Sequence, residues 1–126
     1  MTQEHKELLL KDLCARLPYK VYAQIPDEYG GHTSAIESID IDGFVKDFEG
    51  SLTEIENIKP YLLPLSSMTD GEKLMYEGLM IGTDNNISYI LDVIDWLNAH
   101  HFDYRGLIEK GLAIDATSWR CGTKKL

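Results

Sequence analysis

The chain has 126 residues, of which 44% are hydrophobic, and its formal net charge is −9. This length fits one domain with a modest core, and the longest apolar run is too short to cross a bilayer. The polar, charged N-terminus is unlike a secretory signal, so we expect a cytoplasmic protein without membrane contact. Its two cysteines cannot define a disulfide framework, and we expect both to be reduced thiols.

The negative charge is concentrated in the middle of the chain. Residues 27–57 contain nine acidic residues and a single lysine. Binding to nucleic acid requires clustered Lys and Arg, so direct nucleic-acid binding is not expected. The acids indicate a solvated sheet face, a mimic of nucleic-acid charge, or a docking face for a basic partner protein. The acids expected on the docking face are Glu37, Asp40, Asp42, Asp47 and Glu49.

The first predicted element is a helix over residues 3–17, which Thr2 caps and Pro18 ends. Its expected apolar stripe is Leu10, Leu13, Cys14 and Leu17. A strand over residues 19–25 follows from its Val, Tyr and Ile content, and two glycines then indicate a turn.

Residues 39–42 alternate with the period of a strand, and Asp42-Gly43 is a strong signal for a two-residue hairpin turn. The hairpin would pair Ile39 with Lys46 and Ile41 with Phe44. Phe44 and Phe48 would then lie on the core side of the sheet. A further turn leads to a strand over residues 52–55.

Residues 58–64 are apolar but contain two prolines, which predicts a short helical turn or an extended crossover packed on the sheet. Thr69 and Glu72 have the spacing of a capping box, which predicts a helix from about residue 70 to 81 that Gly82 ends. The expected apolar residues of this helix are Leu74, Met75, Leu79 and Met80.

After a polar loop at residues 83–86, an apolar stripe predicts a third helix. That stripe is Ile87, Ile90, Leu91, Ile94 and Leu97. Asp103 can cap a fourth, short helix that Gly111 closes.

This order of elements predicts an α+β fold: an N-terminal helix, a small curved antiparallel sheet that forms a partial barrel, and C-terminal helices packed to one side. We expect residues 1–116 to form a single globular domain. Residues 117–126 would be a tail that is either mobile or docked on a partner subunit, which leaves homo-oligomerisation open. No Gly-rich phosphate loop is present in the sequence, so a doubly wound nucleotide-binding fold is not expected.

Three ungapped blocks of sequence resemble a known family. They are residues 8–19 (LLLKDLCARLPY), 58–69 (IKPYLLPLSSMT) and 95–113 (DWLNAHHFDYRGLIEKGLA). They are similar to small proteins of unknown function from gut Bacteroidetes and from their phages and mobile elements. The resemblance implies a bacterial cytosolic protein that a phage or mobile element carries, and it transfers no catalytic or binding residue. Residues 115–126 depart from the ending of that family.

The richest group of candidate site residues follows the third predicted helix: Trp96, His100, His101, Tyr104 and Arg105. The aromatic rings can stack on a base, and the guanidinium can hold an anionic group. One function hypothesis is therefore a sponge that sequesters an anionic signalling nucleotide. The alternative reading is that these rings pack in the core.

His100, His101 and Asp103 offer two imidazoles and a carboxylate to a metal. Adjacent histidines at a helix end point in different directions, however, so we expect no metal or cofactor. No nucleophile motif is present in the sequence, and no catalytic residue is predicted. A metal-dependent hydrolase is thus the least favoured hypothesis. The favoured one is a non-enzymatic binding or regulatory protein whose acidic face contacts a basic host or phage protein.

Overall fold

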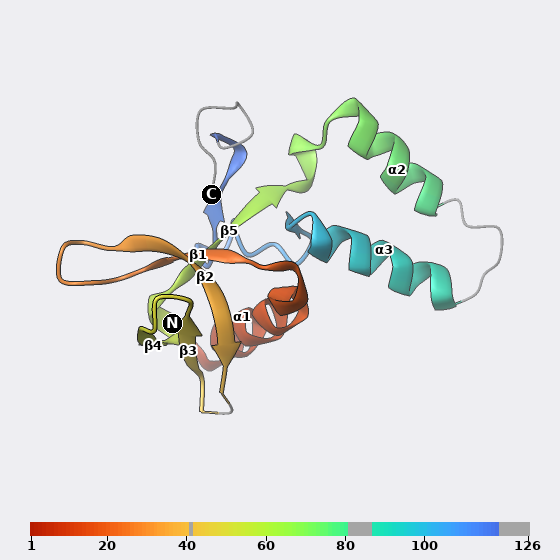
Figure 1. Cartoon of the computed structure of the whole chain (residues 1–126). Helices are drawn as coiled ribbons and strands as arrows, with labels where there is room; N and C mark the ends of the chain where they lie inside the picture. Colours follow the sequence, from red (N-terminus) through yellow and green to blue (C-terminus); the bar gives the residue numbers. More distant parts are fainter. Residues whose placement is uncertain (41, 81–86, 119–126) are drawn as a thin grey trace.

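The computed structural model describes residues 1–40, 42–80 and 87–118 (Figure 1). An N-terminal helix, an open mixed sheet and two later helices make up the described part, which confirms the predicted α+β class. Within these ranges, none of the helices has the length and apolar character needed to cross a membrane.

The sheet has the strand order β4-β3-β2-β1-β5-β6, and β7 also pairs with β5. The main elements are α1 (Gln3–Arg16), β1 (Tyr22–Ile25), β2 (His32–Ile39), β3 (Phe44–Asp47), β4 (Leu52–Glu54), β5 (Lys59–Pro64), α2 (Asp70–Met80), α3 (Ile87–Ala99), β6 (Phe102–Asp103) and β7 (Ile114–Asp115). α1 lies against the sheet, whereas α2 and α3 form a pair that stands to one side of it (Figure 1).

The predicted N-cap of α1 is confirmed, because the Thr2 hydroxyl accepts a hydrogen bond from the His5 amide at 3.1 Å. The face that α1 buries differs from the predicted stripe by one position. It consists of Leu9, Asp12, Leu13 and Arg16, and Cys14 is exposed. The predicted stripe was wrong because Asp12 and Arg16 are buried although they are charged, and the prediction considered apolar residues alone.

The predicted register of the β2–β3 hairpin is wrong. Ile39 pairs with Val45, and Ser38 pairs with Lys46. The turn is longer than two residues, because the Asp40 carboxylate accepts hydrogen bonds from the amides of residues 42 and 44. A shift of one residue exchanges the faces of a strand. Val45 is therefore buried, while Phe44 and Phe48 are 40% and 62% exposed. The predicted pairing of Ile41 lies outside the described residues.

β5 is a strand within the sheet, so the prediction of a helical turn or a crossover packed on the sheet is wrong. It pairs antiparallel with β1 and parallel with β6 and β7. These parallel pairs make the sheet mixed rather than purely antiparallel, and it stays open rather than closing toward a barrel. The prediction was wrong because proline lacks the backbone N–H that a residue within a sheet donates to the neighbouring strand. Pro60 nevertheless lies opposite Ala23 in the ladder.

The capping box at the start of α2 is confirmed. Thr69 donates its amide to the Glu72 carboxylate at 2.9 Å, and Glu72 donates its amide to the Thr69 hydroxyl at 3.2 Å. The expected apolar stripe is less buried than predicted, because Leu74, Met75 and Met80 are 73%, 58% and 49% exposed. The predicted end of the helix at Gly82 and the following loop lie outside the described residues.

The predicted fourth helix is wrong, because residues 104–113 form only turns. The predicted cap is nevertheless present: the Asp103 carboxylate accepts hydrogen bonds from the amides of Leu107 and Ile108, each at 2.9 Å. Gly106 and Gly111 have positive φ angles of 74° and 75° on either side of this turn. The left-handed conformation cannot continue a right-handed helix, so one turn is all that forms.

Two apolar clusters stabilise the fold. The larger lies between α1 and the sheet, and Leu9, Leu13, Ile25, Ile36 and Leu62 are among its members. The smaller joins α3 to the end of the sheet and contains Met68, Val93, Leu97 and Phe102. Both clusters leave the outer surfaces of β3 and β4 and much of α2 uncovered.

Candidate functional site

The aromatic residues at the end of α3 pack on one another. The Trp96 ring stacks on Phe102 with a centroid distance of 5.6 Å, and it contacts the His100 ring at 4.5 Å. Tyr76 of α2 approaches the same indole at 6.1 Å. Trp96 is partly buried against the smaller apolar cluster, and His100 is exposed at its edge. This geometry is that of a packed aromatic cluster.

His101 lies two residues after the end of α3 at Ala99. Its φ angle is 59°, and its Nε2 donates a hydrogen bond to the Tyr19 carbonyl at 3.1 Å. Burial, followed by the positive charge of Arg16, lowers the pKa of His101 to about 4, so this imidazole is neutral at pH 7. The two adjacent histidines therefore do not converge on one point.

Arg105 and Tyr104 belong to a buried polar network with α1. Arg105 pairs through Nε with the Asp12 carboxylate at 3.3 Å, and the same carboxylate pairs with Arg16 at 2.8 Å. The Tyr104 hydroxyl donates to the Asn98 side chain at 2.8 Å. Both guanidinium groups lie over the Tyr104 ring, at 5.4 and 5.0 Å from its centroid. Arg105 thus has a carboxylate partner within the fold.

Asp103 has both carboxylate oxygens occupied by the backbone amides that it caps. Among the described residues, Asp103 does not form a cluster of possible metal ligands with His100 or His101. A cleft of about 420 Å³ lies beside this segment, and its lining includes Ser66, Asp103, Tyr104 and Glu109. Of the five predicted ligand-binding residues, Tyr104 lines this cleft.

The five acids predicted for a docking face fall into two groups. Glu37, Asp42 and Glu49 are exposed around the β2–β3–β4 hairpins. The Asp40 carboxylate holds the β2–β3 turn through the amides of residues 42 and 44. Asp47 is only 1% exposed, so it is not part of a solvated surface. The sequence pattern could not separate these roles, since both groups are carboxylates at similar spacing.

Apolar side chains are exposed among these acids. Phe44, Phe48 and Leu52 are 40%, 62% and 68% exposed. Phe44 pairs with Glu54 and Leu52 pairs with Lys46, so these four side chains share the outer side of the hairpin. We call this surface the β3–β4 face and define it by Phe44, Phe48, Leu52 and the exposed acids Glu37, Asp42, Glu49 and Glu54.

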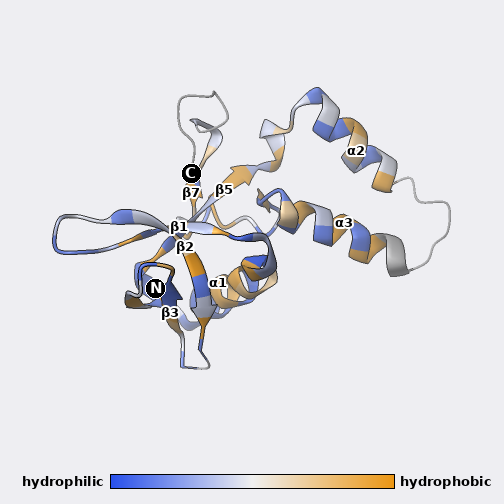
Figure 2. Cartoon of the chain, viewed as in Figure 1, coloured by the Kyte–Doolittle hydropathy of each residue, from blue (hydrophilic) through white to orange (hydrophobic). Residues whose placement is uncertain are grey.

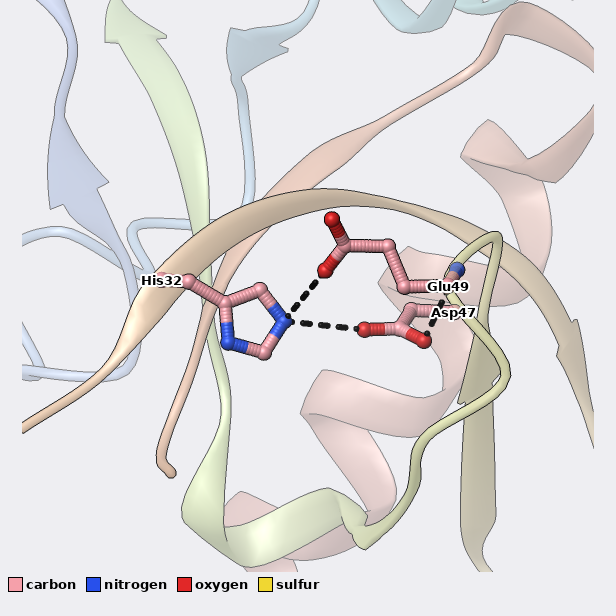
Figure 3. Close-up of side chains that lie close together, drawn as sticks. All are labelled: His32, Asp47 and Glu49. Carbon is pink, nitrogen blue, oxygen red and sulfur yellow. Dashed lines mark hydrogen bonds and ion pairs between the residues drawn. The ribbon is translucent and has the colours of Figure 1, made fainter. Parts of the chain in front are cut away.

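His32 lies at the centre of a cluster of carboxylates that the sequence reasoning missed (Figure 3). Its Nε2 is 3.2 Å from Asp47 Oδ2 and 3.0 Å from Glu49 Oε2. On the other side of the ring, Nδ1 is 2.8 Å from Asp27 Oδ2. The hydrogen bonds to Asp27 and Asp47 raise the pKa of His32 above its usual value. The hydrogen bond from His32 in turn lowers the pKa of Asp27.

Two turns bring this cluster together. Asp27 precedes β2 in the β1–β2 turn and accepts hydrogen bonds from the amides of Tyr29 and Gly31. Asp47 ends β3 and accepts hydrogen bonds from the amides of Glu49 and Ser51. No spacing in the sequence places His32 beside Asp47, because their proximity depends on the irregular register between Ile36 and Ser38.

Comparisons of the chain with protein-family models, with curated proteins and with solved structures found no match.

Proposed function

We propose that this protein is a non-enzymatic binding or regulatory protein that docks a basic partner protein on its β3–β4 face. The observation that carries the proposal is the exposure of two phenylalanines and a leucine among acids on one side of a hairpin. Aromatic side chains with a charged rim are typical of binding hot spots, because the rings supply buried apolar area and the charges select the partner.

Charge supports a basic partner. Glu37, Asp42, Glu49 and Glu54 are exposed around the two rings. A complementary surface rich in Lys and Arg would be attracted to these acids, and an acidic or nucleic-acid surface would be repelled. Lys46 is the one base on the described part of this hairpin. The resemblance of three sequence blocks supports the further proposal that the protein is cytoplasmic, that a phage or mobile element carries it, and that its partner is a host or phage protein.

The test compares a double variant of the face with a matched variant elsewhere. Phe44→Ser with Phe48→Ser removes both exposed rings, while Leu74→Ser with Met75→Ser removes two exposed apolar side chains from α2. Full-length wild-type protein and both variants are immobilised and incubated with lysate of the bacterium that carries the gene. Each protein that wild type captures is then purified, and its Kd is measured for wild type and for both variants.

We expect the face variant to weaken the Kd by about 30-fold or more, as loss of hot-spot aromatics does. We also expect the wild-type affinity to fall as ionic strength rises, because salt screens the acidic rim. If the face variant binds the captured protein as tightly as wild type does, the proposal is wrong.

A further inference from the structure

The side chains of His32, Asp47 and Glu49 converge beneath the β3–β4 turn (Figure 3). We propose that these three side chains form a binding site for one divalent transition-metal ion of the Mn²⁺ or Zn²⁺ class. This inference goes beyond docking on the β3–β4 face, since the site takes an ion rather than a protein, and Glu49 belongs to both surfaces.

The distances suit ligands of one ion. One ligand atom from each of the three residues lies within 4.8 Å of the other two. The His32 nitrogen is 3.2 Å from the Asp47 oxygen and 3.0 Å from the Glu49 oxygen. An ion about 2.0–2.2 Å from each of its ligands holds neighbouring ligand atoms about 3.0–3.5 Å apart. The described arrangement therefore needs only small side-chain adjustments to receive the ion.

Asp27 orients the imidazole for this role. Its carboxylate accepts a hydrogen bond from Nδ1 of His32 at 2.8 Å, and backbone amides of the β1–β2 turn hold that carboxylate in place. Metal-binding histidines characteristically donate their second ring N–H to such a carboxylate. When His32 keeps its proton on Nδ1 alone, the Nε2 lone pair faces the oxygens of Asp47 and Glu49. A divalent cation can then take the place of the proton that His32 otherwise shares with these carboxylates.

The two carboxylates supply an anchored ligand and an accessible one. Asp47 is buried, and its Oδ1 accepts hydrogen bonds from the amides of Glu49 and Ser51, so its Oδ2 is directed at His32. The Glu49 side chain is 64% exposed and that of His32 is 26% exposed, so an ion can enter from solvent. With three protein ligands, the remaining coordination positions would be filled by water.

The donor set selects the class of metal. One imidazole nitrogen and two carboxylate oxygens form a mixed set of nitrogen and oxygen ligands. Mg²⁺ and Ca²⁺ prefer oxygen alone, and Cu⁺ prefers sulfur, whereas Mn²⁺ and Zn²⁺ accept imidazole and carboxylate together. The cluster of His32, Asp47 and Glu49 contains no thiolate. Cys14, the cysteine within the described residues, lies on the exposed side of α1.

Isothermal titration of the metal-free full chain with MnCl₂ and with ZnCl₂ tests the proposal. We expect one ion per chain for at least one of the two metals, with a change in the Nε2 chemical shift of His32 in an imidazole NMR spectrum. His32→Gln and Glu49→Gln should each weaken binding by more than 10-fold, and Asp27→Asn should weaken it by about 10- to 100-fold. His100→Gln serves as the matched control and should bind as wild type does, because this exposed ring packs near Trp96 and Phe102 and is not part of the cluster.

Circular dichroism establishes that each variant is folded. Glu49 is largely exposed, so its variant remains informative even if His32→Gln fails to fold. Absence of stoichiometric binding of both metals overturns the proposal. Binding that Glu49→Gln leaves unchanged, or that His100→Gln abolishes, places the ion elsewhere and overturns it as well.

Discussion

Asp12 is fully buried on α1, where its carboxylate pairs with two guanidinium groups. It pairs with Arg16 at 2.8 Å and with Arg105 at 3.3 Å, and Arg16 also donates to the Phe102 carbonyl at 2.6 Å. Through these contacts α1 is tied to the chain that follows α3. Removing one partner of a buried ion pair leaves an uncompensated charge, which costs far more than the loss of a surface pair.

We therefore expect Asp12→Ala to lower the free energy of unfolding by about 3–5 kcal/mol, because Arg16 stays buried without its carboxylate. Urea unfolding monitored by circular dichroism measures this change. Lys11→Ala is the matched control on the exposed side of α1, and its effect should stay within about 0.5 kcal/mol. A loss below about 1 kcal/mol for Asp12→Ala would contradict a buried network that stabilises the fold.

His101 makes stability depend on pH in a defined direction. Burial, followed by the charge of Arg16, lowers its pKa from 6.5 to about 4 in the folded protein. The unfolded chain therefore binds the extra proton first as pH falls. The contribution of neutral His101 to the free energy of unfolding is fully present above pH 6.5 and is lost as the pH drops toward 4. Its upper limit is about 3 kcal/mol, and the partial exposure of the ring reduces this value.

His101→Asn removes this titration and retains a residue that tolerates the positive φ angle of 59°. We expect the stability of the variant to fall less steeply than that of wild type between pH 6.5 and 4, as measured by urea unfolding at a series of pH values. Parallel pH profiles for the two proteins would show that His101 does not cause the dependence.

The register of the β2–β3 hairpin sets which side chains form the core and which form the β3–β4 face. Val45 is 1% exposed and Phe48 is 62% exposed. Val45→Ala should therefore lower the free energy of unfolding by about 1–3 kcal/mol, and Phe48→Ala should change it by no more than about 0.5 kcal/mol. Chemical denaturation of the two variants measures both values. The reverse order would mean that the two-residue turn expected from Asp42-Gly43 is the true one.

Local signals in the sequence located the starts of two helices and one capped turn. Thr2 caps α1, Thr69 and Glu72 form the capping box of α2, and Asp103 caps the turn after β6. Each of these interactions spans only a few residues, so spacing along the chain is enough to predict it. The helix expected after Asp103 did not follow, because a cap does not determine how long a helix continues.

The sequence pattern was not sufficient to predict how β2 pairs with β3. Asp40 lengthens the β2–β3 turn through its side chain, which moves Phe44 and Phe48 from the predicted core to the surface. The irregular register between Ile36 and Ser38 brings His32 beside Asp47. Neither effect is visible in the hydrophobic pattern, because the first depends on a polar side chain that bonds to nearby backbone amides and the second on an irregular pairing of two strands.

At the scale of the whole molecule, two surfaces of the described residues expose several apolar side chains. One is the β3–β4 face. The other is the arm formed by α2 and α3, where apolar and hydrophilic segments are interleaved (Figure 2). Its exposed apolar residues are Leu74, Met75, Met80, Ile90 and Leu91. The β3–β4 face combines exposed aromatic rings with an acidic rim, which favours a specific contact with a basic partner.

Hydrogen–deuterium exchange of the full chain, with and without its purified partner, separates these two surfaces most directly. Our account predicts slower exchange of the backbone amides of residues 44–54 in the complex, with little change in α2 and α3. Slower exchange confined to α2 and α3, with residues 44–54 unchanged, would contradict the proposal that the β3–β4 face binds the partner.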